Sequence, residues 1–274
     1  GHTKAVIIGN GINSASGHAT LFVYNLASGA LIQEIDTGVG GDNGLSAPRG
    51  WDDNGDGTVD YVYAGDLKGN LWKFNFTAAS ASIALGGTPL FTAASGQPIT
   101  AGLALARDPA TGKRWVFAGT GKFLEEFSEL PNGSMGWYVD LDKPTVAGER
   151  IVSRPQIRGS VLITASIIPP TNNSCEAGGS GYINAIDAFS GTSTGAPYFD
   201  ANRDGKVDGN DQLGSGSNQV PVGSIDLGVG MPTLPTIIDK LLVVGGSTGG
   251  RASITVNPQG GAAQRMSWRE ILGD

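Results

Sequence analysis

The sequence has 274 residues, including 44 glycines and 14 prolines, and a formal net charge of −7. Only 16% of the residues are charged and no basic stripe is present, which argues against nucleic acid or an anionic membrane as a partner. No apolar run approaches the ~20 residues that a membrane-spanning helix needs, so direct membrane insertion is not expected.

Short runs of Val, Ile, Tyr and Trp recur along the chain, and several end in small residues at a glycine turn. The first strand of each repeat is predicted at 5–11, 61–66, 115–121 and 242–246. A second strand is predicted at 21–25, 71–75, 137–140 and 182–187, and a third strand is clearest at 31–35. The repeat interval of roughly fifty residues is typical of β-propeller blades.

The repeats predict an all-β, β-propeller-like fold with short antiparallel blades, organised as one domain over residues 1–274. Four repeats are clear, and a fifth around 254–257 is weak. A closed propeller has about four to eight blades, so the chain is either a small ring or part of a larger one. We favour the C-terminal part of a larger, modified propeller. Short helical turns are predicted only at 122–127 and, from capping-box spacing, at 267–272.

The first acidic loop, residues 52–60, leads directly into the predicted strand at 61–66. Carboxylate or amide oxygens at loop positions 1, 3 and 5, followed by glycine at position 6, are typical of a calcium site. Position 12 is Tyr63, which is no ligand, so the carboxylate at position 9 must close the loop. The predicted ligands are Asp52, Asn54, Asp56, Thr58 through its backbone carbonyl, and Asp60.

A second loop, residues 200–211, repeats this spacing in a polar, glycine-rich stretch from about 191 to 220 where no strand is obvious. It has acidic residues at positions 9 and 12, so it supplies a complete twelve-residue set. The predicted ligands are Asp200, Asn202, Asp204, Lys206 through its carbonyl, Asp208 and Asp211. We therefore expect two Ca²⁺ ions, with metal ordering the second loop.

An ordinary turn also favours Asp, Asn and Gly, but it gives no reason for the same spacing to occur twice. The first loop has a neutral Asn54 and lacks an acidic position 12, so it is predicted to be the weaker site that responds to ambient calcium. The second is predicted to be constitutively occupied. Since millimolar calcium is an extracellular condition, the loops favour a location outside the cell.

Residues 50–74, which contain the first loop and its following strands, resemble the PilY/PilC-type proteins of bacterial type IV pili. Residues 178–188 and 267–272 also resemble this family, whereas the second loop is more similar to dockerin calcium loops. The resemblance implies a C-terminal β-propeller domain of an exported protein at the pilus tip, reached through the periplasm and outer membrane. It also implies roles in pilus biogenesis, in the balance of extension and retraction, in twitching motility and in adhesion. The implied partners are minor pilins of the tip complex and host-surface ligands.

Two other functions remain to be weighed. A calcium-stapled extracellular scaffold would use the same loops without any pilus role. A quinoprotein-like dehydrogenase would also combine calcium with a propeller. The chain lacks the vicinal cysteine pair of such enzymes, since Cys175 is its one cysteine, and its histidines number only two. No catalytic constellation is evident, so no enzyme activity is expected. The tryptophans at 51, 72, 115 and 137 are predicted to pack between blades.

Overall fold

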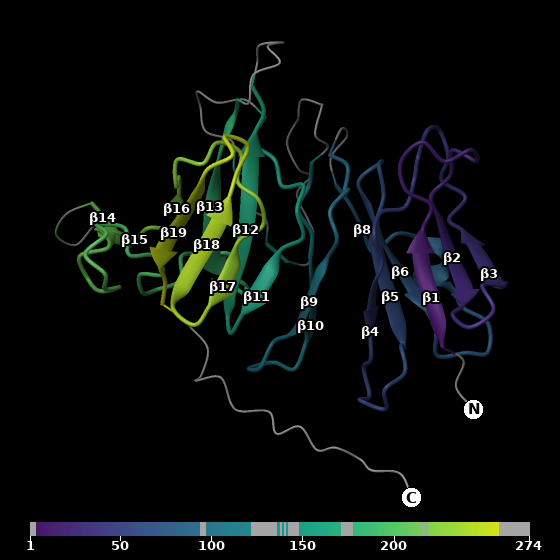
Figure 1. Ribbon diagram of the computed structural model, residues 1–274. Helices are drawn as coiled ribbons and strands as arrows, with labels where there is room; N and C mark the ends of the chain where they lie inside the picture. Colours follow the sequence, from purple (N-terminus) through teal and green to yellow (C-terminus); the bar gives the residue numbers. More distant parts are fainter. Residues whose placement is uncertain are drawn as a thin grey trace, which may run out of the picture.

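The computed structural model describes residues 4–93, 97–121, 136–137, 139, 141, 148–170, 178–214, 216 and 219–257. Within these ranges the regular secondary structure is almost entirely antiparallel β-sheet, and the short 3₁₀ turn η1 (Leu85–Gly87) follows β7. Five sheets, which we call blades 1 to 5, follow one another along the chain and lie side by side as a fan (Figure 1). This confirms the predicted all-β, propeller-like architecture.

Blades 1 to 3 occupy the N-terminal half of the fan. Blade 1 consists of β1 (Ala5–Gly9), β2 (Thr20–Asn25) and β3 (Leu31–Asp36). Blade 2 has the order β4 (Arg49–Trp51), β5 (Tyr61–Gly65), β6 (Asn70–Asn75) and β7 (Ser82–Ile83), with β8 (Phe91–Thr92) also on β6. Blade 3 is the pair β9 (Ala104–Arg107) and β10 (Arg114–Phe117).

Blades 4 and 5 form the other side of the molecule. Blade 4 has the order β11 (Gln156–Arg158), β12 (Val161–Ile168), β13 (Ser180–Asp187) and β16 (Ser224–Ile225). Blade 5 consists of β17 (Thr236–Ile238), β18 (Leu241–Gly245) and β19 (Arg251–Thr255). A small pair, β14 (Gln212–Leu213) and β15 (Val220–Pro221), projects beside them.

Several strand predictions differ from the structure. The strand β12 was not predicted, because all eight of its residues are buried and its sequence lacks the alternation that marks a half-exposed strand. The stretch 191–220, predicted to lack strands, contains the short β14 and the start of β15. Trp137 and Val139 are not in a strand, and 254–257 overlaps β19 of blade 5, so it is no separate repeat. The helical turns predicted at 122–127 and 267–272 lie outside the described residues.

Alternating strand residues build the core between neighbouring blades. Val62, Ala64, Trp72 and Phe74 of blade 2 pack against Leu21 and Ile35 of blade 1. The opposite face of blade 2, including Tyr63 and Leu71, packs with residues of blade 3. Trp72 is 1% exposed, and the side chains of Trp51, Trp115 and Trp137 are half-buried in such clusters. Packing of the tryptophans between blades is thereby confirmed.

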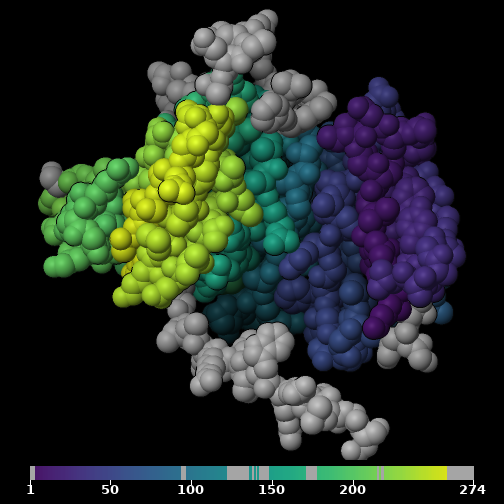
Figure 2. All heavy atoms as spheres, in the orientation of Figure 1, coloured from purple at the N-terminus to yellow at the C-terminus, as the bar shows by residue number. Residues whose placement is uncertain are grey.

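The outward face of blade 1 carries the same pattern without a neighbour among the described residues. Val6 and Ile8 of β1 and Phe22 and Tyr24 of β2 stand where Val62, Ala64, Trp72 and Phe74 stand in blade 2, because both strand pairs have the same register. Val6 is 38% exposed and Ile8 is 44% exposed. This blade forms one end of the fan, shown in purple in Figure 2. An apolar face of this kind would pack against a preceding blade in a larger propeller, which stays a prediction.

Candidate metal centre

The first acidic loop is the connection between β4 and β5 of blade 2. Trp51 and Tyr61 are paired across these strands, and the backbone N–H of Asp60 donates to the carbonyl of Trp51 at 2.9 Å. Asp60 is only 9% exposed, whereas Asp56 is exposed. The loop is therefore anchored at its C-terminal end by the sheet, and Asp60 immediately precedes β5.

Side chains at loop positions 1, 3 and 5 turn back over the loop. Asp52 accepts the backbone N–H groups of Gly55 at 2.7 Å and Gly57 at 2.8 Å. The side-chain oxygen of Asn54 accepts the N–H of Asp56 at 2.8 Å. Gly57, at position 6, has a φ of 85°, a conformation that glycine adopts without strain. Positions 1 and 3 thus accept backbone N–H groups of their own tight loop, and their role as metal ligands stays a prediction.

Asp60 closes this loop. Its Oδ2 atom accepts the backbone N–H groups of Asp53 at 2.7 Å and Asn54 at 3.3 Å. In the second loop the same role belongs to Asp211, which accepts the N–H of Asn202 at 3.2 Å and of Asp208 at 2.8 Å. A carboxylate at position 9 in one loop and at position 12 in the other therefore reaches the opening residues of its loop.

The second loop is more deeply set at its two ends. Asp200 is 3% exposed and Asp211 is 1% exposed. The backbone N–H of Asp200 donates to the carbonyl of Thr255 in β19 at 3.0 Å, and the preceding Phe199 is fully buried in the core of blades 4 and 5. Between these ends Asp204 is exposed and accepts the N–H of Lys206 at 2.9 Å. The loop thus starts and ends at the protein core.

Both loops offer hard oxygen donors that suit Ca²⁺: carboxylates, one amide oxygen, and the carbonyls of Thr58 and Lys206. The donor chemistry fits the metal. Among the described residues, however, no three or more His, Cys, Asp or Glu side chains are grouped in a way that would hold a metal ion, and the carboxylates accept backbone N–H groups instead. The ligand assignments and the two Ca²⁺ ions stay predictions.

Asp53, at position 2, faces away from the other acidic side chains of the first loop. Its Oδ1 atom lies 2.7 Å from Arg107 Nη2 and accepts the Trp51 indole N–H at 3.1 Å, and its Oδ2 atom lies 3.3 Å from Arg114 Nη1. The indole hydrogen bond, followed by the charges of Arg114 and Arg107, holds the pKa of the Asp53 carboxyl below its usual range, although desolvation opposes this shift. Asp53 is therefore a contact to blade 3.

Sequence analysis did not single out Asp66, which is 0% exposed. One of its oxygens accepts side-chain hydrogen bonds from Asn43 at 3.0 Å, Asn70 at 2.9 Å and Trp72 at 2.9 Å. Its other oxygen accepts the backbone N–H groups of Lys68 and Asn70. Five donors satisfy this buried carboxylate, which ties the turn after β5 to the segment that connects blades 1 and 2. The sequence offered one sign of this arrangement, the turn-forming run from Asp66 to Asn70 directly after a predicted strand.

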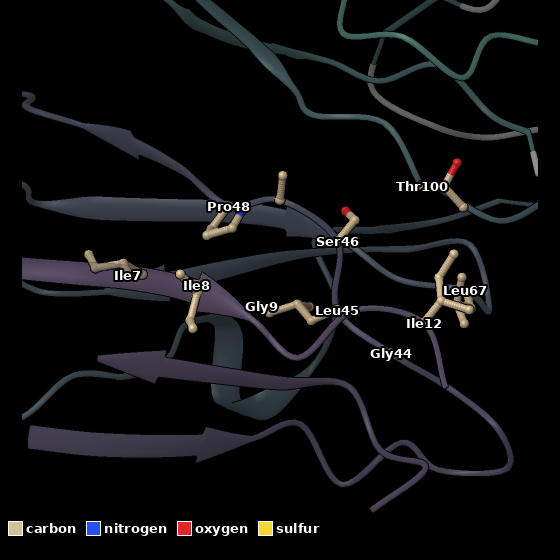
Figure 3. Close-up of a pocket in the computed structure, with 12 residues that line it drawn as sticks. Ile7, Ile8, Gly9, Ile12, Gly44, Leu45, Ser46, Pro48, Leu67 and Thr100 are labelled. Carbon is tan, nitrogen blue, oxygen red and sulfur yellow. The ribbon is translucent and has the colours of Figure 1, made fainter. Parts of the chain in front are cut away.

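A pocket of about 570 Å³ lies between β1 and the segment that leads into β4 (Figure 3). Its lining contains no ionisable side chain. Its two hydroxyl groups, on Ser46 and Thr100, donate hydrogen bonds to the carbonyls of Gly65 and Gly121. The remaining lining residues are apolar or glycine: Ile7, Ile8, Gly9, Gly11, Ile12, Gly44, Leu45, Ala47, Pro48 and Leu67.

The chain is similar to proteins of bacterial type IV pili. It is 31% identical over 325 residues to a type IV pilus biogenesis factor PilY1 homolog of Xylella fastidiosa, covering 98% of this chain and 25% of that protein. It is 28% identical over 364 residues to the type IV pilus biogenesis factor PilY1 of Pseudomonas aeruginosa strain PAO1, covering 98% of this chain and 31% of that protein. The chain therefore spans roughly a quarter to a third of these relatives.

A solved structure and a family model agree with these relatives. The crystal structure of the Pseudomonas aeruginosa PilY1 C-terminal domain matches with a TM-score of 0.74 and 26% identity, covering 93% of this chain and 69% of that one. No helix within the described ranges has the length and apolar character to cross a membrane. The model of the PilY1 β-propeller domain matches residues 2–163, a segment that includes the first acidic loop and ends before the second. Because this match covers more than half of the sequence, the chain belongs to the PilY1 β-propeller family.

Proposed function

We propose that this chain is a calcium-binding propeller domain of a type IV pilus biogenesis factor and that it acts without enzymatic activity. The pilus role is supported by the similarity of 98% of the chain to proteins named as type IV pilus biogenesis factors. The calcium role is supported by the shared geometry of the two loops. In this proposal the domain is extracellular at the pilus tip, and it supports pilus extension and retraction, twitching motility and adhesion through minor pilins and surface ligands.

The single observation that carries the calcium part is the equivalence of Asp60 and Asp211. Each is nearly buried, each accepts at least one backbone N–H from the opening part of its loop, and each is held in place by the adjoining sheet or core. A Ca²⁺ ion shared by such a carboxylate and the inward-turned side chains would link the two ends of the loop. Binding at residues 52–60 would then stiffen the connection between β4 and β5.

Calorimetric titration of Ca²⁺ into chelator-treated protein tests this proposal. We expect two binding events in the unchanged protein, with the weaker one lost in Asp56→Ala and the tighter one lost in Asp204→Ala. Asp226→Ala is the matched control, because Asp226 is an exposed aspartate outside both loops. An unchanged protein that binds no Ca²⁺ at millimolar concentration would overturn the calcium proposal.

The pilus part needs a separate measurement in a bacterium that carries the complete protein. We expect chromosomal Asp56→Ala or Asp60→Ala to reduce twitching motility while the protein is still made and exported. Normal motility and normal piliation with either variant would contradict a calcium-dependent pilus role.

A purely structural role is favoured by one observation at the second loop. Asp200 and Asp211 lie at the core of blades 4 and 5, so metal bound there would contribute mainly to folding. The scaffold function predicts that loss of either site lowers thermal stability and leaves motility unchanged. The same pair of measurements therefore distinguishes the two functions.

A further inference from the structure

Arg107 and Arg114 are placed directly opposite each other in the antiparallel pair of β9 and β10. Like charges at directly opposite positions of a sheet repel and destabilise the pair. Both guanidinium groups reach out of blade 3 to one acceptor, the Asp53 carboxylate, at 2.7 Å from Arg107 and 3.3 Å from Arg114. This single carboxylate offsets the repulsion between the two arginines.

The arginines also contact the strands on either side of the first loop. The guanidinium of Arg107 lies 5.9 Å from the ring centroid of Trp51 in β4, and that of Arg114 lies 5.0 Å from the ring of Tyr61 in β5. Arg107 additionally donates to the backbone carbonyl of Asp53 at 3.4 Å. The two arginines therefore contact the base of the loop from the neighbouring blade.

Asp53 connects these arginine contacts to Asp60, the carboxylate that closes the loop. Its side chain binds blade 3, while its backbone N–H is the donor to Asp60 Oδ2 at 2.7 Å. Any motion that separates blades 2 and 3 at this point therefore displaces Asp53, which is hydrogen-bonded to Asp60. Movement of Asp60 toward a bound cation also displaces Asp53, through the hydrogen bond from the Asp53 backbone N–H.

We propose that Asp53, Arg107 and Arg114 form a latch that couples calcium binding in the first loop to the contact between blades 2 and 3. The inference rests on the calcium function proposed above and assigns Asp53 a positioning role. Coupling of this kind is reciprocal: if the latch strengthens calcium binding, calcium strengthens the latch by the same factor.

Two physical effects of the arginines on calcium affinity have opposite signs, and this makes the inference testable. Two guanidinium charges near the loop repel a cation, so electrostatics alone predicts that their removal strengthens calcium binding. The latch holds the loop in its closed form, so its loss means that calcium binding must also order the loop. The proposal requires that the second effect is larger.

The experiment is calcium titration of the double variant Arg107→Gln/Arg114→Gln, measured by calorimetry and by intrinsic tryptophan fluorescence, to which Trp51 beside the first loop contributes. The charge-matched control is Arg158→Gln/Arg251→Gln, which removes two arginines of blades 4 and 5. We expect the latch variant to bind Ca²⁺ at the first loop about fivefold more weakly than the control, the size typical of coupling through exposed ion pairs. The calcium-dependent part of the fluorescence change should shrink, while the second loop binds as before.

Each outcome decides a different statement. Unchanged or tighter binding by the latch variant, alongside a first-loop event that Asp56→Ala removes, would overturn the latch and leave the calcium function intact. No first-loop event in the unchanged protein would overturn both. Should the double variant fail to fold, Arg114→Gln alone provides the test, because it removes the longer of the two contacts and leaves the other in place.

Discussion

The Asp60 carboxylate accepts the backbone N–H of Asp53 at 2.7 Å, so the residue that precedes β5 closes the loop that begins just after β4. Asp60 is nearly buried and Asp53 is joined to blade 3. The short distance between these two residues therefore connects the loop, its own hairpin and the neighbouring blade.

Removal of this closing carboxylate should destabilise the fold even without metal. In the presence of a chelator, Asp60→Ala leaves the N–H groups of Asp53 and Asn54 without their acceptor, which should lower the free energy of unfolding by about 1–3 kcal/mol. Asp56→Ala at the exposed tip should lower it by less than about 1 kcal/mol. Urea denaturation monitored by tryptophan fluorescence compares the two, and equal effects would contradict the closing role of Asp60.

Calcium should raise the stability of the domain by mass action. At a concentration one hundred times the Kd of a site that exists only in the folded state, binding adds about 2.7 kcal/mol to the free energy of unfolding. We expect Asp204→Ala to lose the larger part of the calcium-induced rise in Tm and Asp56→Ala the smaller part. Scanning calorimetry with calcium or a chelator measures this, and equal rises in all three proteins would exclude both loops as the sites.

The buried carboxylate of Asp66 should be among the most sensitive positions of blade 2. Asp66→Ala leaves the buried donors of Asn43, Asn70 and Trp72 without their acceptor, so we expect a loss of at least about 3 kcal/mol of unfolding free energy. Asp226→Asn, at an exposed residue, is the control and should change stability by less than about 0.5 kcal/mol. A small effect of Asp66→Ala in equilibrium urea denaturation would show that water replaces the carboxylate.

Equivalent aromatic residues of blades 1 and 2 should respond differently to truncation. Trp72→Ala removes a side chain from a closed core and should cost about 3–5 kcal/mol. Phe22→Ala removes its counterpart from the outward face of blade 1 and should cost within about 1 kcal/mol in this chain. If the larger propeller is correct, the Phe22→Ala cost rises in a longer protein that supplies the preceding blade, and an unchanged cost would argue against such a neighbour.

Acid should weaken a contact of blade 1. Although partial burial raises the pKa of Asp36, the Gly38 N–H at 2.8 Å and His18 Nδ1 at 2.9 Å outweigh it and lower that pKa. A lowered pKa in the folded state stabilises the protein above the unfolded-state pKa of about 3.9, and this contribution is lost as pH falls through the folded-state value. Asp36→Asn should therefore have a lower Tm than the unchanged protein at pH 5, with the difference disappearing in stronger acid. A difference that persists there would exclude this ionisation as its cause.

The sequence by itself determined the propeller class, because the same strand pattern recurs along it. In blades 1 and 2 this repeat gives the same register, with Val6 opposite Tyr24 and Val62 opposite Phe74. It also determined the two tight acidic loops themselves, because aspartates that accept backbone N–H groups a few residues ahead and a glycine with positive φ at position 6 are local features of the sequence. These features depend on neighbours that are close in sequence.

Only the tertiary structure decided the features that join distant segments. The buried strand β12 lacks alternation because both of its faces are covered, and coverage is a property of the packed blades. Asp53 has the same local sequence preferences as the aspartates around it, but its side chain binds Arg107, 54 positions away in the chain. That contact depends on how blade 3 packs beside blade 2, which local spacing does not encode.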